Sequence, residues 1–172
     1  MKVKKITTPI IDQMVEQLEV GDMISLSGYI YTGRDAVLPK IVSLIKSNEL
    51  SRYYIRLEGS VIFHTAVSPA GVGPTSSNKY EIESSIPALS KAGVKLHLGK
   101  GSLDKRTIQA LEDYNSVYAI IPPVTALLNS LTLSKRIVAF PELGMEALHL
   151  LEVKEYPAII AAAHGKSIYD ER

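Results

Sequence analysis

The sequence predicts an α/β fold built on a mixed sheet with flanking helices, and three observations lead to this expectation. Apolar strand-like runs alternate with helical patterns through the second half of the chain, which is typical of parallel strands joined by helices. The first half holds more strand and loop, which favours a sheet of mixed direction. The length of 172 residues suits one domain, and we expect residues 1–172 to form it.

The predicted elements of the first half follow from periodicity. Alternating and β-rich residues predict a strand over 23–31. A helix follows, since Pro39 suits a first turn and four apolar residues share one helix face: Leu38, Ile41, Val42 and Ile45. A short buried strand is expected over 61–63. We then expect a short helix that begins near Pro87 and ends at Gly93.

The second half continues the alternation. Strands are predicted in four places: 95–98, 117–121, 137–140 and 158–162. Ser102 is expected to cap a helix that runs to about Tyr114, and helical spacing recurs over 124–131. The pattern over 145–153 is ambiguous between helix and strand.

Composition excludes several classes of protein. The chain has no cysteine, so it forms no disulfide, thiolate zinc site or iron–sulfur cluster with ligands of its own. Its 19 Lys and Arg against 18 Asp and Glu leave a net charge of +1, which gives no global reason to expect nucleic acid or an anionic membrane as partner. The basic start is followed by no apolar run of leader or span type, so we expect a cytoplasmic protein.

Three glycine-bearing segments carry the candidate chemistry, and the first is Ser27–Asp35. It joins a predicted strand to a predicted helix, where α/β folds place ligand sites and where free N–H groups can meet an anion. Arg34 would supply a planar, bidentate partner for a carboxylate. The alternative is an ordinary helix start, capped by Asp35, with Arg34 in solvent.

The second and third turns are 71–77 and 99–102. In the second, glycines permit close approach of a ligand to the backbone, Lys79 adds a cation, and three hydroxyl side chains follow one another: Thr75, Ser76 and Ser77. It lacks the Lys-hydroxyl ending of a P-loop, so we reject nucleotide binding by that motif. In the third, Lys100 is expected near a helix N-terminus, which also suits an anion. The alternatives are a flexible polar loop and an ordinary strand-to-helix turn.

Taken together, the cations Arg34, Lys79 and Lys100 suit a small dicarboxylate, because each carboxylate takes at least one charge-assisted partner. No metal site is predicted. Of the four histidines, His64 and His97 lie in or beside predicted strands and are expected to be structural. His149 and His164 have no carboxylate or histidine at ligand spacing, so we expect packing or surface roles.

Five segments, in order, resemble the β subunit of the class I (iron–sulfur) fumarase and L-tartrate dehydratase family, which is equivalent to a C-terminal domain. Residues 20–22, 26–28 and 32–35 resemble the family's "VGD…LSG…TARDAAHKR". Residues 73–77 resemble "GPTTS", and residues 99–101 resemble "GKGG". The family's closing block is matched in four pieces: 142–147, 152–153, 157–158 and 165–169.

This resemblance implies a swivelling β/β/α domain and a hydro-lyase that is active only with an α subunit. The expected activity is fumarate hydratase, which converts fumarate and water to malate. The alternatives are L-tartrate dehydratase or another 2-hydroxydicarboxylate dehydratase and, more remotely, a non-catalytic dicarboxylate-binding or assembly module. The family's [4Fe-4S] cluster is expected on the cysteine-bearing α subunit, in an α2β2 assembly.

The resemblance also implies roles for individual residues. Thr75 takes the position of the family's catalytic threonine, and Ser76 takes that of a second threonine. The expected substrate-binding set is Arg34, Lys79, Lys100, Thr32 and Gly73. Some positions depart from the family: Lys79 replaces arginine, 38–40 replaces His-Lys-Arg, Ser102 replaces a glycine, and 122–125 replaces a glycine- and alanine-rich turn.

Overall fold

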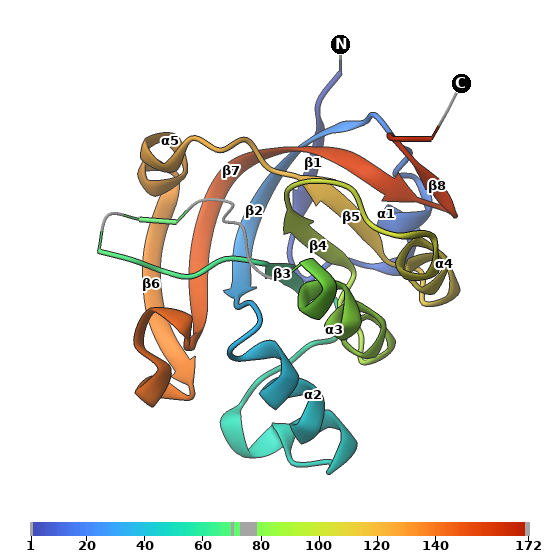
Figure 1. The fold of residues 1–172 in the computed structure, drawn as a ribbon. Coiled ribbons are helices and arrows are strands. Elements are labelled where there is room, and N and C mark those ends of the chain that lie inside the picture. The colour runs from blue at the N-terminus through green and yellow to red at the C-terminus, as the bar shows by residue number, and fades with distance from the viewer. Residues whose placement is uncertain (1, 70, 73–78, 171–172) are drawn as a thin grey trace.

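The computed structural model describes residues 2–69, 71–72 and 79–170, and their framework is one mixed sheet (Figure 1). Its strands are β1 (Lys4–Thr7), β2 (Met23–Thr32), β3 (Val61–Phe63), β4 (Leu96–Gly99), β5 (Val117–Ile120), β6 (Thr132–Ala139), β7 (Leu148–Ala163) and β8 (Lys166–Ser167). The strands β1 to β5 pair in chain order and in parallel. The long strand β7 runs antiparallel to β2, β5, β6 and β8. Because β7 pairs with both β5 and β2, the sheet closes into a barrel.

Helices flank this barrel, as the predicted α/β class requires. They are α1 (Asp12–Glu16), α2 (Leu38–Lys46), α3 (Lys79–Lys91), α4 (Lys105–Asp113) and α5 (Thr125–Ser130), with 3-10 turns η1 (Leu50–Tyr53) and η2 (Pro141–Glu146). Figure 1 shows α2, α3 and α4 following one another along one side of the barrel. None of these described helices has the length and apolar character needed to cross a membrane.

The core has an inner and an outer layer because successive residues of a strand point to opposite faces. Leu26, Phe63 and Tyr156 are buried inside the barrel, where the rings of Phe63 and Tyr156 meet edge to face with centroids 6.4 Å apart. On the outer face, Ile62 packs with Leu38 of α2 and Leu89 of α3. The amphipathic spacing predicted for α2 therefore serves to cover the sheet.

Several predicted boundaries were wrong. Helix α4 is capped by Asp104, whose side chain accepts from the Thr107 N–H (2.8 Å), and Ser102 lies before it. Helix α3 begins well before Pro87, which lies inside it. The ambiguous stretch 145–153 divides between η2 and the start of β7. Strand β6 begins at Thr132, five residues earlier than predicted. Most of its residues are solvent-exposed and do not alternate with buried ones, so the sequence pattern did not reveal its first part.

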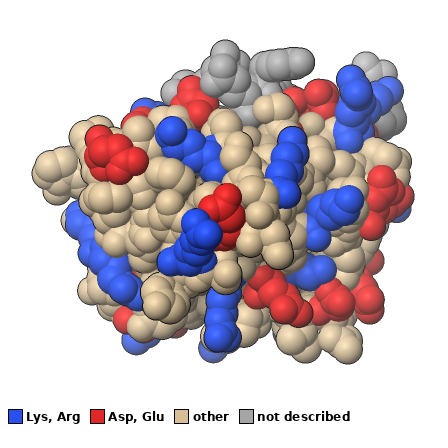
Figure 2. Space-filling model, turned by 90° about the horizontal axis from the view of Figure 1, so that it is seen from below, with Lys and Arg blue, Asp and Glu red and all other residues tan. Residues whose placement is uncertain are grey.

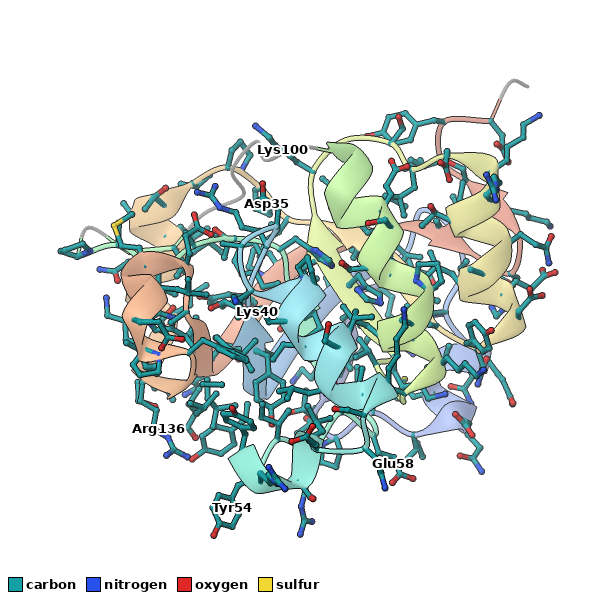
Figure 3. All side chains as sticks on the ribbon, turned by 60° about the horizontal axis from the view of Figure 1, so that its bottom comes forward. Asp35, Lys40, Tyr54, Glu58, Lys100 and Arg136 are labelled. Carbon is teal, nitrogen blue, oxygen red and sulfur yellow. The ribbon has the colours of Figure 1, made fainter. Side chains whose placement is uncertain are left out.

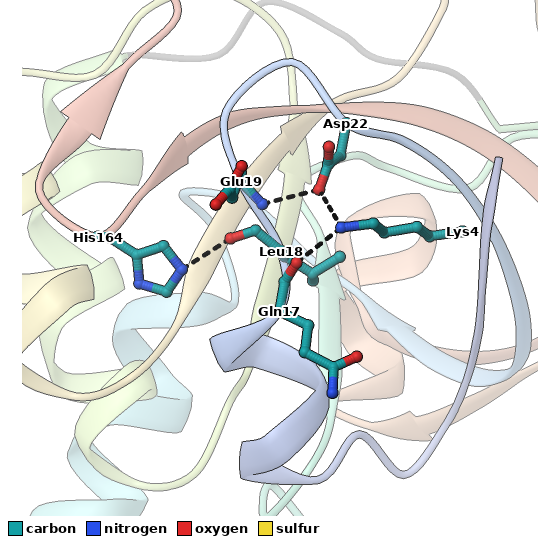
Figure 4. Close-up of polar contacts among 6 residues, drawn as sticks. All are labelled: Lys4, Gln17, Leu18, Glu19, Asp22 and His164. Carbon is teal, nitrogen blue, oxygen red and sulfur yellow. Dashed lines mark hydrogen bonds and ion pairs between the residues drawn. The ribbon is translucent and has the colours of Figure 1, made fainter. Parts of the chain in front are cut away.

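The unpredicted N-terminal strand β1 is held by polar contacts (Figure 4). The Lys4 ammonium donates to the Asp22 carboxylate and to the Gln17 carbonyl, both at 2.7 Å. Asp22 also accepts from the backbone N–H of Glu19 (2.8 Å). His164, expected to be a packing or surface residue, is exposed and bonds through Nε2 to the Leu18 carbonyl (2.7 Å).

Candidate functional site

The carboxyl ends of β2, β3 and β4 form one edge of the barrel, and the backbone ladder continues past them. The Gly33 N–H donates to the Phe63 carbonyl (3.1 Å), and the His64 N–H donates to the Leu98 carbonyl (2.9 Å). Neighbouring strands lie about 4.8 Å apart, so the ends of β2 and β4 are roughly 10 Å from each other. Two of the predicted turns, at Arg34 and at Lys100, therefore open on the same edge.

Figure 3 shows Lys100 and Asp35 at one end of the molecule, above α2 and α3, with Tyr54 and Glu58 at the opposite end. Helix α3 also begins on the Lys100 side, because a crossover helix runs against the parallel strands that it joins. The backbone of Lys79, its first residue, is thus placed at this edge.

The turn at Arg34 depends on a tight contact between the strand end and α2. A Cβ added at Gly33 would lie 2.6 Å from Val37 Cγ1 and 3.1 Å from Leu38 Cδ2. The quoted family pattern has alanine at both position 33 and position 37, so the larger Val37 is compensated by the missing Cβ of Gly33. Leu38 stands where the quoted family pattern has histidine. It is fully buried in the outer core, so this difference from the family changes packing.

Arg34 is paired with Glu146, from η2, and both side chains are largely buried, with 21% and 25% exposed. The Arg34 Nε–H donates to both Glu146 oxygens, at 2.7 Å and 3.0 Å, and Nη2 donates to Oε1. This hydrogen bond raises the pKa of Arg34, while burial opposes it. The alternative of Asp35 as a helix cap with Arg34 in solvent was wrong: the cap residue is Val37, and no side chain caps α2.

The register of the sheet explains this long-range pair. Thr32 of β2 stands opposite His149 of β7 in an antiparallel ladder, so the chain just beyond Thr32 lies next to the chain just before His149. Arg34 and Glu146 are 112 residues apart in sequence. No local sequence pattern predicts an ion pair between residues so far apart, and Glu146 was not predicted as a site residue.

The turn at Lys100 is anchored by Tyr118 of β5. The Tyr118 hydroxyl donates to the Gly101 carbonyl (3.0 Å), and a Cβ at Gly99 would lie 3.2 Å from that hydroxyl. Burial raises the pKa of Tyr118, so the phenol stays protonated as a donor. Lys100 itself is exposed. It stands four residues before the Asp104 cap of α4, so the expected place at that helix N-terminus was wrong.

Gly73, Thr75 and Ser76 lie outside the described residues, and only the backbone of Lys79 is described. The chain before this segment is well anchored: Val72 is buried in the barrel core with Phe63. A Cβ at Gly71 would lie 3.0 Å from Cβ of Asn129, in α5.

A buried polar chain lies behind the edge. His64 Nε2 is 2.9 Å from His97 Nδ1, and His97 Nε2 is 2.9 Å from the Ser90 hydroxyl. Burial lowers the pKa of His64 to about 3 and, with the neighbouring His64, lowers that of His97. Both rings are therefore neutral, and their shared buried hydrogen bond fits the structural role expected of them. His149 is also buried, and its Nδ1 lies 2.9 Å from the Ala147 carbonyl.

Two buried polar atoms at the edge have no hydrogen-bond partner among the described residues: Thr32 Oγ1 and His64 Nδ1. An unsatisfied buried polar atom costs free energy and calls for an explanation, such as a bound ligand or water. Thr32, expected in the substrate-binding set, thus has an unused hydroxyl at the end of β2.

An open groove of about 390 Å³ is lined by residues of β6, η2 and the start of β7, and its basic side chains were not predicted. Its lining includes Lys135, Arg136, Met145 and His149. Met145 precedes Glu146 in the chain, and His149 stands opposite Thr32. Elsewhere, on the face seen in Figure 2, basic and acidic side chains are interspersed, in keeping with the near-zero net charge.

Comparison with known proteins decides the family. The model of the family described as "Fumarase C-terminus" matches residues 1–172. This chain belongs to that family. Two of its relatives match this chain over most of their own length. A "Putative L(+)-tartrate dehydratase subunit beta" of Methanocaldococcus jannaschii is 35% identical, with 91% of this chain and 86% of the relative covered. The L(+)-tartrate dehydratase subunit beta of Escherichia coli is 29% identical, with 98% and 87% covered.

A third relative is longer. The anaerobic class I fumarate hydratase of Escherichia coli is 30% identical over 85% of this chain, which spans 28% of that relative. The predicted family is thus confirmed: the chain is of the β-subunit type of class I fumarate hydratases and L-tartrate dehydratases. The relatives include both L(+)-tartrate dehydratase β subunits and class I fumarate hydratases, which are hydro-lyases.

The residues of this chain do not fit an iron–sulfur cluster. The sequence has no cysteine. Across the described ranges, no group of three or more His, Asp or Glu side chains is arranged to hold a metal.

Proposed function

We propose that this chain is the β subunit of a two-subunit hydro-lyase, that it binds the carboxylates of a four-carbon dicarboxylate, and that it contributes acid–base groups. The proposed reaction is the reversible addition of water to fumarate to give malate. The observation that carries the proposal is that the turns bearing Arg34 and Lys100 follow the ends of β2 and β4 on one barrel edge, with those strand ends roughly 10 Å apart.

The two cations are suited to different parts of the task. Arg34 offers a planar fork of donors whose orientation is set by Glu146, which favours one carboxylate in one geometry. Lys100 is an exposed point charge on a turn that Tyr118 anchors, and it has no ion pair within the described part of the chain. A dianion held by both would have its two ends distinguished. Lys79, Thr32 and Gly73 complete the proposed binding set.

Thr75 and Ser76 are the proposed acid–base groups, on the strength of the family motif that they occupy. A threonine hydroxyl is a very poor base at its free pKa, so a neighbour must activate it. Closure of the site by a second subunit would exclude water and strengthen the effect of the clustered cations.

L-tartrate is the second candidate substrate, and a specific observation favours it. The Methanocaldococcus jannaschii and Escherichia coli relatives, each matched over most of its length, are named as a putative L(+)-tartrate dehydratase β subunit and an L(+)-tartrate dehydratase β subunit.

The family's [4Fe-4S] cluster is proposed to reside on a cysteine-bearing partner α subunit, because this chain has no thiolate to offer. The complete enzyme is then a split active site in an assembly that we propose to be α2β2. The binding-module alternative differs in a simple way: it would bind a dicarboxylate alone and need no partner.

The test is anaerobic co-expression with a candidate α subunit, followed by assays of fumarate, malate, L-tartrate and D-tartrate. We expect turnover either of fumarate and malate or of L-tartrate. The kcat/KM of the preferred substrate should exceed that of the other at least tenfold, because a site that hydrogen-bonds an extra hydroxyl discriminates strongly. A purified complex that turns over none of the four would refute the hydro-lyase proposal.

A further inference from the structure

The groove lined by β6, η2 and the start of β7 contains a histidine to which the proposed function gives no role. His149 is only 7% exposed, and it lines the groove. Its Nδ1 lies 2.9 Å from the Ala147 carbonyl. A carbonyl oxygen only accepts, so Nδ1 carries the proton of this hydrogen bond, and the uncharged ring has a bare acceptor at Nε2. Within the described part of the chain, Nε2 makes no hydrogen bond, so it is the polar atom that His149 offers to a ligand.

A second unused polar group lies next to His149 on the same face of the sheet. Thr32 of β2 stands directly opposite His149 in the antiparallel ladder. Side chains at opposed positions share a face, with Cβ atoms about 4.5–5.5 Å apart. The Thr32 hydroxyl is buried and has no hydrogen-bond partner among the described residues, although buried polar groups are nearly always paired. Two unused groups side by side indicate a place for a small polar group from outside the described chain.

A cation also lies on this face of the groove. Ile137 of β6 stands opposite His149, and Lys135 is two residues before Ile137, so the alternation of a strand puts Lys135 on the face of His149. The same register makes Lys135 a diagonal neighbour of His149, about 7–8 Å away. Lys135 is exposed and forms no ion pair with any residue that the structure describes. Its charge is therefore available to an anion in the groove.

This combination of groups favours a carboxylate that carries a neighbouring hydroxyl. Lys135 suits the carboxylate, and an uncharged imidazole nitrogen accepts a hydrogen bond from the hydroxyl. A dicarboxylate without a hydroxyl has only acceptor oxygens to place against His149 Nε2, so that nitrogen would stay unpaired. The groove, at about 390 Å³, is within the range of roughly 300–1,000 Å³ that is usual for small-molecule sites.

We propose that His149 is a specificity-determining residue: its Nε2 accepts a hydrogen bond from the hydroxyl of a 2-hydroxycarboxylate in this groove, and Lys135 pairs with the adjacent carboxylate. This inference rests on the proposed function, since the ligand is the hydroxylated dicarboxylate of that reaction. Thr32, already in the proposed binding set, links the groove to the end of β2. The chain thereby distinguishes a hydroxylated dicarboxylate from one that has no hydroxyl.

The test is calorimetric binding of L-malate and succinate, which differ by one hydroxyl, to the full chain, since every residue of the groove belongs to it. The wild type should bind L-malate at least tenfold more tightly than succinate, because a site that hydrogen-bonds a hydroxyl discriminates against its absence. His149→Phe should remove this preference by weakening the binding of L-malate alone. Lys135→Gln should weaken both ligands by similar factors and leave the preference. The matched control is His164→Phe, which should change neither affinity, since His164 follows the opposite end of β7.

Three results overturn the inference. The first is a wild-type chain that binds no L-malate or binds the two ligands equally. The second is a preference for L-malate that persists in His149→Phe. The third is a preference that falls as far in His164→Phe as in His149→Phe.

A measurement on the wild-type chain makes the test independent of variants that fail to fold. The nitrogen chemical shift of an imidazole responds to hydrogen bonding at that nitrogen. Saturating L-malate should therefore move the Nε2 resonance of His149 further than saturating succinate does, while the His164 resonances stay in place. Equal movement of the His149 resonance with both ligands would refute the hydroxyl contact.

Binding and turnover separate this inference from the proposed function. If the α–β complex turns over a hydroxydicarboxylate but His149→Phe keeps the preference for L-malate, the inference fails and the hydro-lyase stands. If the preference depends on His149 but the complex turns over no dicarboxylate, the hydroxyl-binding role stands and the hydro-lyase fails.

Discussion

At the scale of single residues, Lys100 provides the sharpest test of substrate binding. Lys100→Gln removes the charge and keeps most of the side-chain length. A charge-assisted hydrogen bond contributes about 1.5–3 kcal/mol, so kcat/KM of the reconstituted enzyme should fall roughly 10- to 100-fold. The control is Lys105→Gln, an exposed lysine at the start of α4. Equal effects of the two substitutions would remove Lys100 from the site.

The residues differ in how far their surroundings could be predicted from sequence. Arg34 and Lys100 were predicted as candidates because a glycine-flanked turn after a strand is a local pattern, and the structure brings their two turns to one edge. The partner of Arg34 was not predictable from local sequence, since Glu146 is 112 residues away and its place depends on the register of β2 with β7. Thr75 and Ser76 remain predictions.

At the scale of elements, the bulge in β2 at Gly28 is the point where packing demands glycine. The register of β2 with β7 shifts between Leu26 and Gly28, and Gly28 has a φ of +115°. A Cβ there would lie 2.2 Å from Thr8 Oγ1 and 3.2 Å from the Thr8 backbone nitrogen. The Thr8 N–H is itself bonded to the Ser27 carbonyl, so this backbone has little room to move.

Gly28→Ala should therefore lower the free energy of unfolding by about 3 kcal/mol or more, from overpacking added to backbone strain. Gly21→Ala is the matched control: its φ is +93°, but a Cβ there would meet no atom within 4 Å. Strain alone should cost it about 1–2 kcal/mol. Urea unfolding of the two variants checks the difference, and similar losses would show that the contact with Thr8 does not matter.

The elements also show which patterns mislead. Helices α2 and α4 were predicted because one face of each is buried, which leaves a clear period. Strand β7 was only partly predicted, because its neighbours change along its length and its exposure changes with them. Strand β1 was missed because it is short, lysine-rich and only partly buried.

At the scale of the whole molecule, the buried histidine pair links folding to pH. In the folded chain, the pKa of His64 is lowered to about 3 and that of His97 is also lowered, whereas both are about 6.5 when unfolded. Between these values the unfolded chain binds more protons. Stability is therefore fully present above about pH 6.5 and is lost as pH falls, by roughly 1 kcal/mol per pH unit for each histidine.

Urea unfolding at pH 7 and pH 5 measures this loss. The double variant His64→Gln with His97→Gln should lose clearly less stability on acidification than the wild type does. A wild-type acid dependence in the double variant would assign the pH effect to other groups.

The closed barrel could be predicted only in part. Alternating strands and helices predicted the mixed α/β class, because that rule needs only the order of elements. The closure was not predicted, since it depends on β2 meeting a strand more than a hundred residues later. That closure places the Arg34 and Glu146 segments together, so the same long-range contact that shapes the molecule completes the candidate site.

The central claim is that this chain is half of a split active site, and a complementation titration tests it most directly. Purified cluster-loaded α subunit is held constant under anaerobic conditions, and this chain is added while turnover of the preferred dicarboxylate is followed. The account predicts no turnover by either subunit alone and activity that rises with added chain to saturation near equal amounts. Full activity of the α subunit without this chain, or no activity at any ratio, would contradict it.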